Sequence, residues 1–413
     1  MRIVHLYKDY FPPVRGGIEQ TVSRMARAQA AAGHEVTVLT SAHGGRRDHE
    51  ERVDGVRIVR CSEWARVASA PLCPGMPAAL ARLSADVFHL HYPNPTGEVS
   101  WLLTRPRGAM VVTYHADIVR QAAAMPVYAP FVRALLARAA VIMPTSEAYI
   151  GRSTFLRPHR SKCMVVPHGI EVERFAGLER EGRAAAALRE RYGTPLVLFV
   201  GRLRYYKGLD VLLDAMPAVS GRLVIVGEGP EAGHLRERTR ALGLAERVSF
   251  AGDVSDAALL DHLAAADVGV MPSTLPSEAW GMAMVEMLAA GLPVVCTELG
   301  TGTTFVNRDG ETGLVVPPGD ARALAGALNR LLGDPALARR FGAAGKRRAT
   351  ELFSTGAMMR GVEAAYRRAL AARGGGAARA LRNAARPVRR ASAVLQGARR
   401  PARRDGHRLR PPR

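Results

Sequence analysis

Short apolar runs rich in β-branched residues alternate with longer helical segments along the first half of the chain. The first helical segment covers residues 18–32 and ends at Gly33. Because the runs are apolar almost throughout, they suit a parallel sheet that is covered on both faces. We therefore predict a doubly wound α/β domain with strands at 2–7, 35–40, 56–60, 86–92, 109–115, 140–146 and 162–169.

The same alternation starts again after a looser region between about residues 167 and 191, where we place a domain boundary. Helices are expected between strands predicted at 195–202, 222–230, 247–252, 267–273, 292–297 and 313–318. The chain should thus contain two doubly wound, Rossmann-like α/β domains, over residues 1–168 and 172–350, followed by an amphipathic helix at about 355–372.

The formal net charge of +21 is concentrated near the C-terminus. Residues 371–413 contain 13 arginines and one acidic residue, Asp405, so they carry +12 and leave +9 for the first 370 residues. We expect residues 373–413 to be a basic, disordered tail, because they lack the apolar periodicity of a core. The tail either binds anionic lipid headgroups or is a solvated extension without a dedicated partner, and no specific nucleic acid is expected.

Cysteine usage and the N-terminus both favour a cytoplasmic protein. The four cysteines lie far apart, without a CxxC pair or a nearby histidine at metal-binding spacing, which favours solitary reduced thiols. No apolar run approaches the roughly 20 residues of a membrane span. The start, MRIVHLY, leads directly into a strand without the pattern of a signal peptide.

Polar side chains gather where the predicted strands end, which is the edge at which parallel sheets bind ligands. His89 and His91 end one strand, and His115 and Asp117 follow the next, within TYHAD. A histidine there can hydrogen-bond a sugar hydroxyl or stabilise charge at a reacting carbon, but it can equally be structural.

Arg202 and Lys207 lie in VGRLRYYKG, just past a predicted buried strand. Two cations at the mouth of one strand suit a diphosphate, because Arg binds two oxygens at once and Lys acts as a point charge. A solvated loop is the alternative. The pair Gly16–Gly17, ahead of the first helix, would let the backbone approach a ligand, although a simple turn is also consistent.

The stretch SEAWGMAMVEMLAAG, residues 277–291, turns from an irregular entry into a helix near Gly281. The first free N–H groups of such a helix bind anions. Glu278 precedes the helix and Glu286 lies over a turn inside it, and carboxylates accept hydrogen bonds from the paired hydroxyls of sugars and riboses. On spacing alone, a helix with an ordinary surface glutamate is equally consistent.

Together these signals describe a sugar joined to a nucleoside diphosphate, bound between two α/β domains. No DxD triplet occurs, so we expect no metal, and the cations and the helix dipole would neutralise the leaving diphosphate. The incomplete glycine motif at Gly227 and Gly229 has Ala232 where a third glycine could stand, and we expect no dinucleotide cofactor.

At this point the sequence resembles the family 4 retaining glycosyltransferases of the GT-B fold. The resemblance covers about residues 1–370 and is more specific in the C-terminal half. It is carried, in order, by GGIE (16–19), TYHAD (113–117), TSEAY (145–149), VVPHGIE (165–171), VGRLRYYKGLD (200–210), VGEGPE (226–231), SEAWGMAMVEMLAAGLPVV (277–295) and GTGTTFVNRDGETGLVVPPGD (300–320).

The resemblance implies a role for each candidate site residue. Arg202 and Lys207 would bind the donor diphosphate, Glu278 the donor sugar and Glu286 the ribose. The remaining candidates would be His115 near the anomeric centre, Gly281 and Met282 as backbone donors, and Gly16 and Gly17 beside the diphosphate and the acceptor.

The resemblance also implies the overall organisation and the reaction. It implies two domains that face each other across a cleft, an N-terminal domain that binds the acceptor, and a final helix that crosses back onto that domain. Transfer would proceed with retention and without an essential metal, by attack on the face from which the leaving phosphate departs while that phosphate accepts the proton.

Two positions depart from the family pattern. Trp280 stands where Phe is usual, and His168 where the motif usually reads Pro-Asn-Gly, so the role of each is open. HYPNP (91–95) and ELGTGTTFVN (298–307) look most like enzymes of surface-polysaccharide assembly, several of them mannosyltransferases, which favours GDP-mannose as the donor.

We therefore expect a hexosyltransferase that extends a glycan, which can be lipid-linked, in the cytoplasm or on the inner face of the membrane. A nucleotide-sugar epimerase or a phosphorylase of the same fold is an alternative. A non-catalytic membrane- or nucleic-acid-binding protein is a further alternative, although the concentration of charge in the tail argues against it for the body of the chain.

Overall fold

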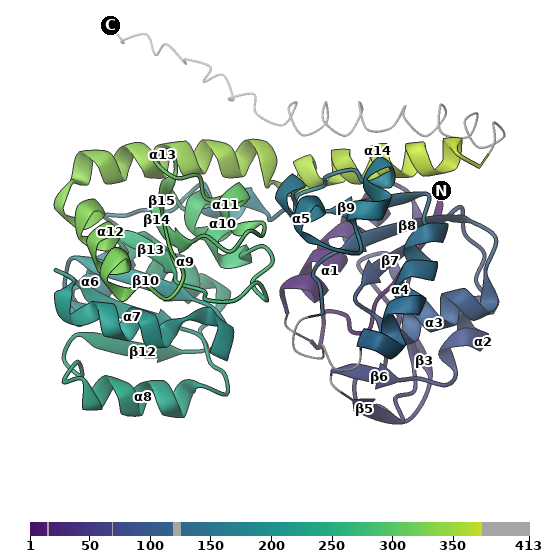
Figure 1. Cartoon of the computed structure of the whole chain (residues 1–413), viewed down its shortest axis with the longest axis horizontal. Helices are drawn as coiled ribbons and strands as arrows, with labels where there is room; N and C mark the ends of the chain where they lie inside the picture. The colour runs from purple at the N-terminus through teal and green to yellow at the C-terminus, as the bar shows by residue number, and fades with distance from the viewer. Residues whose placement is uncertain (15, 68, 119–124, 374–413) are drawn as a thin grey trace, which may run out of the picture.

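The computed structural model describes residues 1–14, 16–67, 69–118 and 125–373 of the 413-residue chain. These residues form two α/β domains that lie side by side (Figure 1), as the alternating pattern predicts. The basic tail expected at 373–413 lies outside the described residues, apart from Arg373.

The N-terminal domain is built on a seven-stranded sheet with the order β3-β4-β2-β1-β7-β8-β9. All neighbours are parallel except β3 and β4, which are antiparallel. β5 (Ala65–Val67) and β6 (Ala70–Leu72) form a separate small hairpin. The strands of the main sheet are β1 (Arg2–Leu6), β2 (Glu35–Ser41), β3 (His49–Val53), β4 (Val56–Cys61), β7 (Val87–Tyr92), β8 (Ala109–Tyr114) and β9 (Val141–Pro144).

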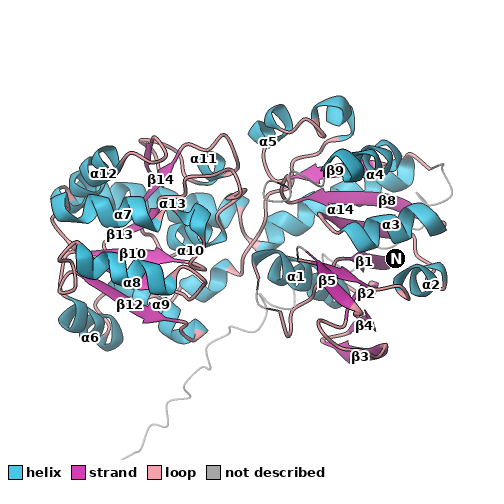
Figure 2. Cartoon of the chain, turned by 60° about the horizontal axis from the view of Figure 1, so that its bottom comes forward, coloured by secondary structure: helices cyan, strands magenta, loops and turns pink. Residues whose placement is uncertain are grey.

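The C-terminal domain is built on a six-stranded, wholly parallel sheet with the order β12-β11-β10-β13-β14-β15. Helices lie on both faces of each main sheet (Figure 2), which explains why the strands read as continuous apolar runs. The strands are β10 (Leu196–Val200), β11 (Arg222–Val226), β12 (Val248–Gly252), β13 (Val268–Met271), β14 (Val294–Thr297) and β15 (Gly313–Val316).

The helices follow the strands along the chain. In the first half they are α1 (Gly17–Ala31), α2 (Met76–Ala81), α3 (Pro95–Thr104), α4 (Met125–Arg138) and α5 (Glu147–Arg152). In the second half they are α6 (Arg183–Tyr192), α7 (Leu209–Ala215), α8 (Ala232–Ala241), α9 (Asp256–Ala265), α10 (Met282–Ala289), α11 (Thr303–Val306), α12 (Ala321–Gly333) and α13 (Pro335–Leu352).

A last helix, α14 (Thr355–Ala371), follows α13 but packs on the N-terminal domain (Figure 1). Ser354 caps it by accepting a hydrogen bond from the backbone N–H of Ala357. Its buried side chains, including Met358, Val362 and Tyr366, join Ile3 and other residues of the N-terminal sheet in one apolar cluster. The N-terminal core is therefore completed by residues from the far end of the chain.

One predicted strand is wrong, and three were missed, namely β3 and the two short strands of the β5–β6 hairpin. Lys162 ends a 3-10 helix, residues 163–169 run as an extended connection, and Cys163 pairs with Ile142 only through an isolated bridge. The apolar Val165 and Val166 gave this segment its strand-like pattern. In contrast, β3 reads HEERV and is exposed along an outer edge, so its polar sequence carries no signal of a buried strand.

Candidate active site

The two cations and two carboxylates predicted in the C-terminal domain follow two adjacent strands. Arg202 and Lys207 follow β10, and Glu278 and Glu286 follow β13, its neighbour in the sheet. The strand order reverses direction between β10 and β13, because β11 and β12 lie on one side and β14 and β15 on the other. Such a switch point opens a crevice at the carboxyl ends of the strands, where α/β sheets bind ligands.

Lys207 and Glu278 form a buried ion pair at this switch point. Lys207 Nζ lies 2.5 Å from Glu278 Oε2, and the two residues are 8% and 7% exposed. Ser273 Oγ also donates to Glu278 Oε2, at 3.3 Å. Burial by itself lowers the pKa of Lys207, but the Glu278 carboxylate outweighs this effect and raises the pKa above its usual value. The lysine therefore stays charged, and the pair holds both side chains in place.

Two glycines with positive φ shape the backbone around this pair. At Gly208, φ is 70°, and a Cβ atom would lie 1.9 Å from the carbonyl oxygen of Pro272. Gly281 has φ 85° and is the N-cap of α10, where a Cβ atom would lie 2.6 Å from Met284 Cε. A backbone contact excludes any side chain at Gly208, and the positive φ favours glycine at Gly281, where α10 begins.

The helices α1 and α10, one from each domain, begin next to each other. A Cβ atom on Gly17 would lie 3.4 Å from Met282 Cγ, so the two first turns are in close contact. Neither N-cap, Gly16 or Gly281, has a side chain that could cap its helix. At α1 the carboxylate of Glu19 lies against Gly16 and accepts a hydrogen bond from its own backbone N–H. The first turn of α10 holds no acidic residue, so its backbone N–H groups stay available. The positive end of α10 is therefore well suited to a phosphate group, whereas Glu19 offsets the positive end of α1 beside it.

Glu286 lies in α10 and is partly exposed. Burial raises the pKa of its carboxyl group, while the charges of Arg24 and Arg174 act in the opposite direction. Arg24 belongs to α1, and it donates through Nη1 to the carbonyl oxygen of Gly169 at 3.4 Å. Arg24 is thus a cation of the N-terminal domain that lies near Glu286, the residue predicted to bind the ribose. No motif marked it, because its signal is only a helical arginine.

Arg202 and His115 form no hydrogen bond with Lys207 or Glu278 among the described residues. Arg202 is exposed and forms no hydrogen bond or ion pair with another described residue. His115 follows β8 in the N-terminal domain and is 3% exposed. Its Nε2 lies 3.1 Å from His91 Nδ1, and its Nδ1 lies 3.0 Å from His168 Nε2, so both ring nitrogens are already engaged.

Trp280 and His168, the two positions that depart from the family pattern, lie against each other with ring centroids 5.8 Å apart. The indole of Trp280 is 4% exposed and packs against Phe305 and Phe353. Its Nε1 is buried and has no hydrogen-bond partner among the described residues. Trp280 is therefore mainly a core residue that supports the start of α10, and His168 lies between it and His115.

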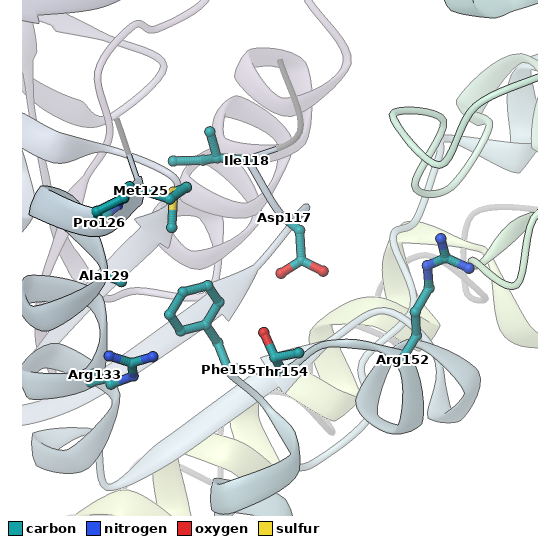
Figure 3. Close-up of a pocket in the computed structure, with 9 residues that line it drawn as sticks. All are labelled: Asp117, Ile118, Met125, Pro126, Ala129, Arg133, Arg152, Thr154 and Phe155. Carbon is teal, nitrogen blue, oxygen red and sulfur yellow. The ribbon is translucent and has the colours of Figure 1, made fainter. Parts of the chain in front are cut away.

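A cavity of about 600 Å³ opens on the N-terminal domain (Figure 3). Asp117 supplies a carboxylate, which accepts a hydrogen bond from Ser153 Oγ at 2.9 Å. Arg152 extends towards the C-terminal domain in Figure 3, where its Nη1 donates to the carbonyl oxygen of Leu299 at 3.1 Å. The cavity is lined by Asp117, Ile118, Met125, Pro126, Ala129, Arg133, Arg152, Thr154 and Phe155.

One group of described side chains has the spacing of a metal site. The ligand atoms of His5, His89 and His91 lie within 4.8 Å of one another, and all three residues are fully buried. Each of their ring nitrogens is, however, already within hydrogen-bond distance of another side chain. The group lies in the core of the N-terminal sheet, away from the Lys207–Glu278 pair.

Within the described residues, no helix is long and apolar enough to cross a membrane.

Comparisons with known protein families match both halves of the chain. Residues 16–169 match the family described as "Glycosyl transferase 4-like domain", and residues 183–348 match "Glycosyl transferases group 1". These two ranges cover the N-terminal sheet except β1, and most of the C-terminal domain.

Relatives of similar length align over most of the chain. The O-antigen chain mannosyltransferase C of Escherichia coli is 33% identical over 367 residues, which cover 87% of this chain and 96% of the relative. The D-rhamnosyltransferase WbpZ of Pseudomonas aeruginosa is 33% identical over 365 residues, covering 86% and 92%. The phosphatidyl-myo-inositol mannosyltransferase of Mycobacterium leprae is 32% identical over 351 residues, covering 80% and 88%.

Solved structures share the arrangement of both domains. The sucrose-phosphate synthase of Thermosynechococcus elongatus superposes with a TM-score of 0.76 at 26% identity, covering 90% of this chain and 99% of that chain. WaaG, described as a glycosyltransferase involved in lipopolysaccharide biosynthesis, gives a TM-score of 0.64 at 20% identity, covering 88% and 98%. The predicted GT-B fold is confirmed, and the chain belongs to the group 1 glycosyltransferases, the family that its motifs indicate.

Proposed function

We propose that this glycosyltransferase transfers a hexose, with retention and without a metal ion, from a nucleotide sugar to a growing glycan. The donor is GDP-mannose, and the acceptor is a lipid-linked glycan of surface polysaccharide or glycolipid synthesis. The enzyme acts in the cytoplasm, where the arginine-rich residues 373–413 hold it against anionic lipid on the inner face of the membrane.

The observation that carries this proposal is the meeting of α1 and α10 beside the buried Lys207. The N-terminus of α10, which has no acidic residue in its first turn, and one fixed ammonium group can stabilise a departing diphosphate without a divalent cation. Arg202, which is exposed and unpaired among the described residues, is free to add a bidentate contact when the diphosphate arrives. In this assignment Glu278 contacts the sugar and Glu286 the ribose.

The choice of mannose is supported by the relatives. Two of the three relatives compared above are named mannosyltransferases, and the third is named a rhamnosyltransferase, which transfers a related deoxyhexose. The acceptor would bind on the N-terminal domain, where the cavity lined by Asp117, Arg133 and Arg152 offers both charges to a glycan.

The decisive experiment is a panel of GDP-, UDP- and ADP-sugars, tested for thermal stabilisation and for sugar transfer by the purified full-length protein. GDP-mannose should raise the melting temperature most, because stabilisation follows the logarithm of site occupancy. NMR of the product should show the anomeric configuration of the donor, and EDTA should leave the rate unchanged. Preference for another base, inversion at the anomeric carbon, or loss of activity with EDTA would each contradict the corresponding part of the proposal.

A further inference from the structure

Five histidines form a buried row in the N-terminal domain and reach its boundary with the C-terminal domain. His5 lies in β1 and His89 and His91 lie in β7, the two central neighbours of the sheet. His115 follows β8, and His168 lies in the segment that leads into the C-terminal domain. None of the five is more than 6% exposed.

Four of these imidazoles are joined end to end by hydrogen bonds. His5 Nδ1 lies 3.0 Å from His91 Nε2. His91 Nδ1 lies 3.1 Å from His115 Nε2, and His115 Nδ1 lies 3.0 Å from His168 Nε2. The repeated pairing of one Nδ1 with the next Nε2 makes a continuous chain from the centre of the sheet to Trp280, whose ring lies against His168.

The inner end of the chain is held by an amide and a phenol. Gln29 of α1 accepts at Oε1 from His5 Nε2, with a separation of 2.7 Å. Its Nε2 donates to the hydroxyl of Tyr366 in α14 at 3.0 Å, and that hydroxyl lies 2.7 Å from His89 Nδ1. His89 Nε2 in turn lies 2.7 Å from Thr113 Oγ1. Both ends of the Gln29 amide are therefore used.

The hydrogen bonds between these histidines all run in one direction because the imidazoles are neutral. Burial lowers the pKa of every histidine in it, to about 4 for His5 and His168. A neutral imidazole carries one N–H group and one acceptor nitrogen. Since His5 must donate through Nε2 to Gln29, its Nδ1 must accept from His91, and the same assignment passes along the row. His168 then donates through Nε2 and keeps Nδ1 as an acceptor, to which no described residue donates.

This direction decides which histidine can contact a substrate. His115 has no free nitrogen, because it donates to His91 and accepts from His168. His168 does have a free acceptor, and it lies beside the residue that precedes the N-cap of α10. The histidine of this row that can accept a further hydrogen bond is therefore His168 and not His115.

We propose that His168 accepts, at Nδ1, a hydrogen bond from a hydroxyl group of the transferred sugar, and that Gln29 is the positioning residue that keeps His168 in this tautomer. The inference rests on the proposed function in one respect, namely that the ligand is a nucleotide sugar. The tautomer itself is a property of the protein alone and can be measured without any substrate.

The first measurement is NMR of the full chain labelled with ¹⁵N at histidine, since long-range ¹H–¹⁵N correlations distinguish Nε2–H from Nδ1–H. His5, His91, His115 and His168 should all carry the proton on Nε2. The variant Gln29→Met removes the acceptor and should produce a population of Nδ1–H at His168. Gln29→Glu restores an oxygen acceptor and should restore the pattern, and Thr113→Val, at the other side of His89, should leave it unchanged.

The second measurement is calorimetric binding of GDP-mannose and of GDP. His168→Leu should weaken GDP-mannose roughly tenfold, the effect of one lost hydrogen bond in a buried site, while GDP binds as before. His168→Asn can both donate to His115 and accept from the sugar, so it should stay within about threefold of the wild type. If Gln29→Met unfolds the protein, the wild-type spectrum together with the two His168 variants still decides the matter.

Several outcomes would overturn the inference. A wild-type His168 protonated at Nδ1, or a stoichiometric metal bound to His5, His89 and His91 in elemental analysis, would remove the hydrogen-bonded chain. Equal weakening of GDP and GDP-mannose by His168→Leu would show a structural role only. If the wild type binds neither ligand, the donor assignment has failed and the role of His168 in binding the sugar falls with it, while the spectrum still decides the role of Gln29.

Discussion

The two domains share one architecture but differ in where their buried polar groups lie. The C-terminal domain has one extensive apolar cluster around its six-stranded sheet, and its main buried charges, Lys207 and Glu278, lie beyond the ends of the strands. The N-terminal core is divided into three apolar clusters, and histidines from the strands themselves form a row within the sheet. Both domains contain ion pairs with a buried carboxylate, such as Asp9–Arg66 in the first domain, but a row of directed hydrogen bonds between neutral imidazoles is described only in the N-terminal domain.

This difference separates two tasks of a sugar transfer. A diphosphate needs positive charge, and buried charge is stable only when it is paired, as in Lys207–Glu278. A sugar has only neutral hydroxyl groups, and these are best recognised by neutral partners whose donors and acceptors are fixed. Variants in the two domains should therefore fail in different ways.

The largest effect is expected from Lys207→Met. Loss of the ammonium group removes charge stabilisation from the leaving diphosphate, which should lower the rate of transfer by roughly 10²- to 10³-fold. It also leaves Glu278 buried without its partner, at a cost of about 3–5 kcal/mol in the free energy of unfolding. Transfer assays and urea unfolding would measure the two effects.

Two matched variants separate chemistry from stability here. The double variant Lys207→Met with Glu278→Gln should recover most of the stability but none of the transfer. Glu286→Gln should lose transfer while its stability stays at or above that of the wild type, because burial of this carboxyl group disfavours its charged form. If Lys207→Met retains near-normal turnover, the assignment of the diphosphate site is wrong.

The next largest effect is a loss of stability at acid pH. Folding lowers the pKa of the five histidines below the usual 6.5, to about 4 for His5 and His168, so the unfolded chain binds more protons in this range. Their contribution to stability is complete above about pH 6.5 and is lost as the pH falls towards 4. Each contributes a slope of up to about 1.4 kcal/mol per pH unit. Burial raises the pKa of Glu98 to about 7 and also raises the pKa of Glu19, so these two carboxyl groups act in the opposite direction but offset only two of the five protons.

The N-terminal domain should consequently open first in acid. Urea unfolding at pH 7, 5.5 and 4.5, followed by a hydrogen-exchange pulse at one fixed pH, would report each domain separately. His91→Gln should make the pH dependence less steep, whereas His49→Gln should not, because His49 is exposed on β3. Earlier opening of the C-terminal domain would contradict this contrast between the domains.

The smallest effect is expected from Trp280→Phe. The smaller ring leaves space between Phe305 and Phe353, which destabilises the core, but the change also removes a buried indole N–H without a partner. The two contributions oppose each other, so the unfolding free energy should change by less than about 1.5 kcal/mol. A markedly altered donor preference in the sugar panel would instead place the indole in contact with substrate.

The fold could be predicted from the sequence because apolar periodicity reports local structure directly. The prediction failed where an apolar sequence and a strand do not coincide. Residues 162–169 are apolar but form no strand, and β3 is a strand with a polar sequence. The candidate site was less accessible. Lys207 and Glu278 could each be predicted as a site residue from a local motif, but their pairing joins residues 71 positions apart, and no local pattern encodes it.

The histidine row was invisible for the same reason. His89, His91 and His115 each read as single polar residues at strand ends, and His168 reads as a departure from a motif. Their alignment depends on the register between β1, β7 and β8, which pairs His5 with His89 and His91 with Thr113. Gln29 and Tyr366, which hold the row at its inner end, are 337 residues apart in the chain.

The packing of α14 on the N-terminal sheet also affects how the protein is made. During synthesis the ribosome releases the strands of the first domain long before Met358, Val362 and Tyr366, which fill one side of its core. The second domain, by contrast, has its whole apolar cluster between Ile170 and Phe353 and can close as soon as that segment has emerged. The domain that is translated first is therefore the last to be finished, and part of one face of its sheet, around β8 and β9, stays uncovered until the end of the folded chain arrives.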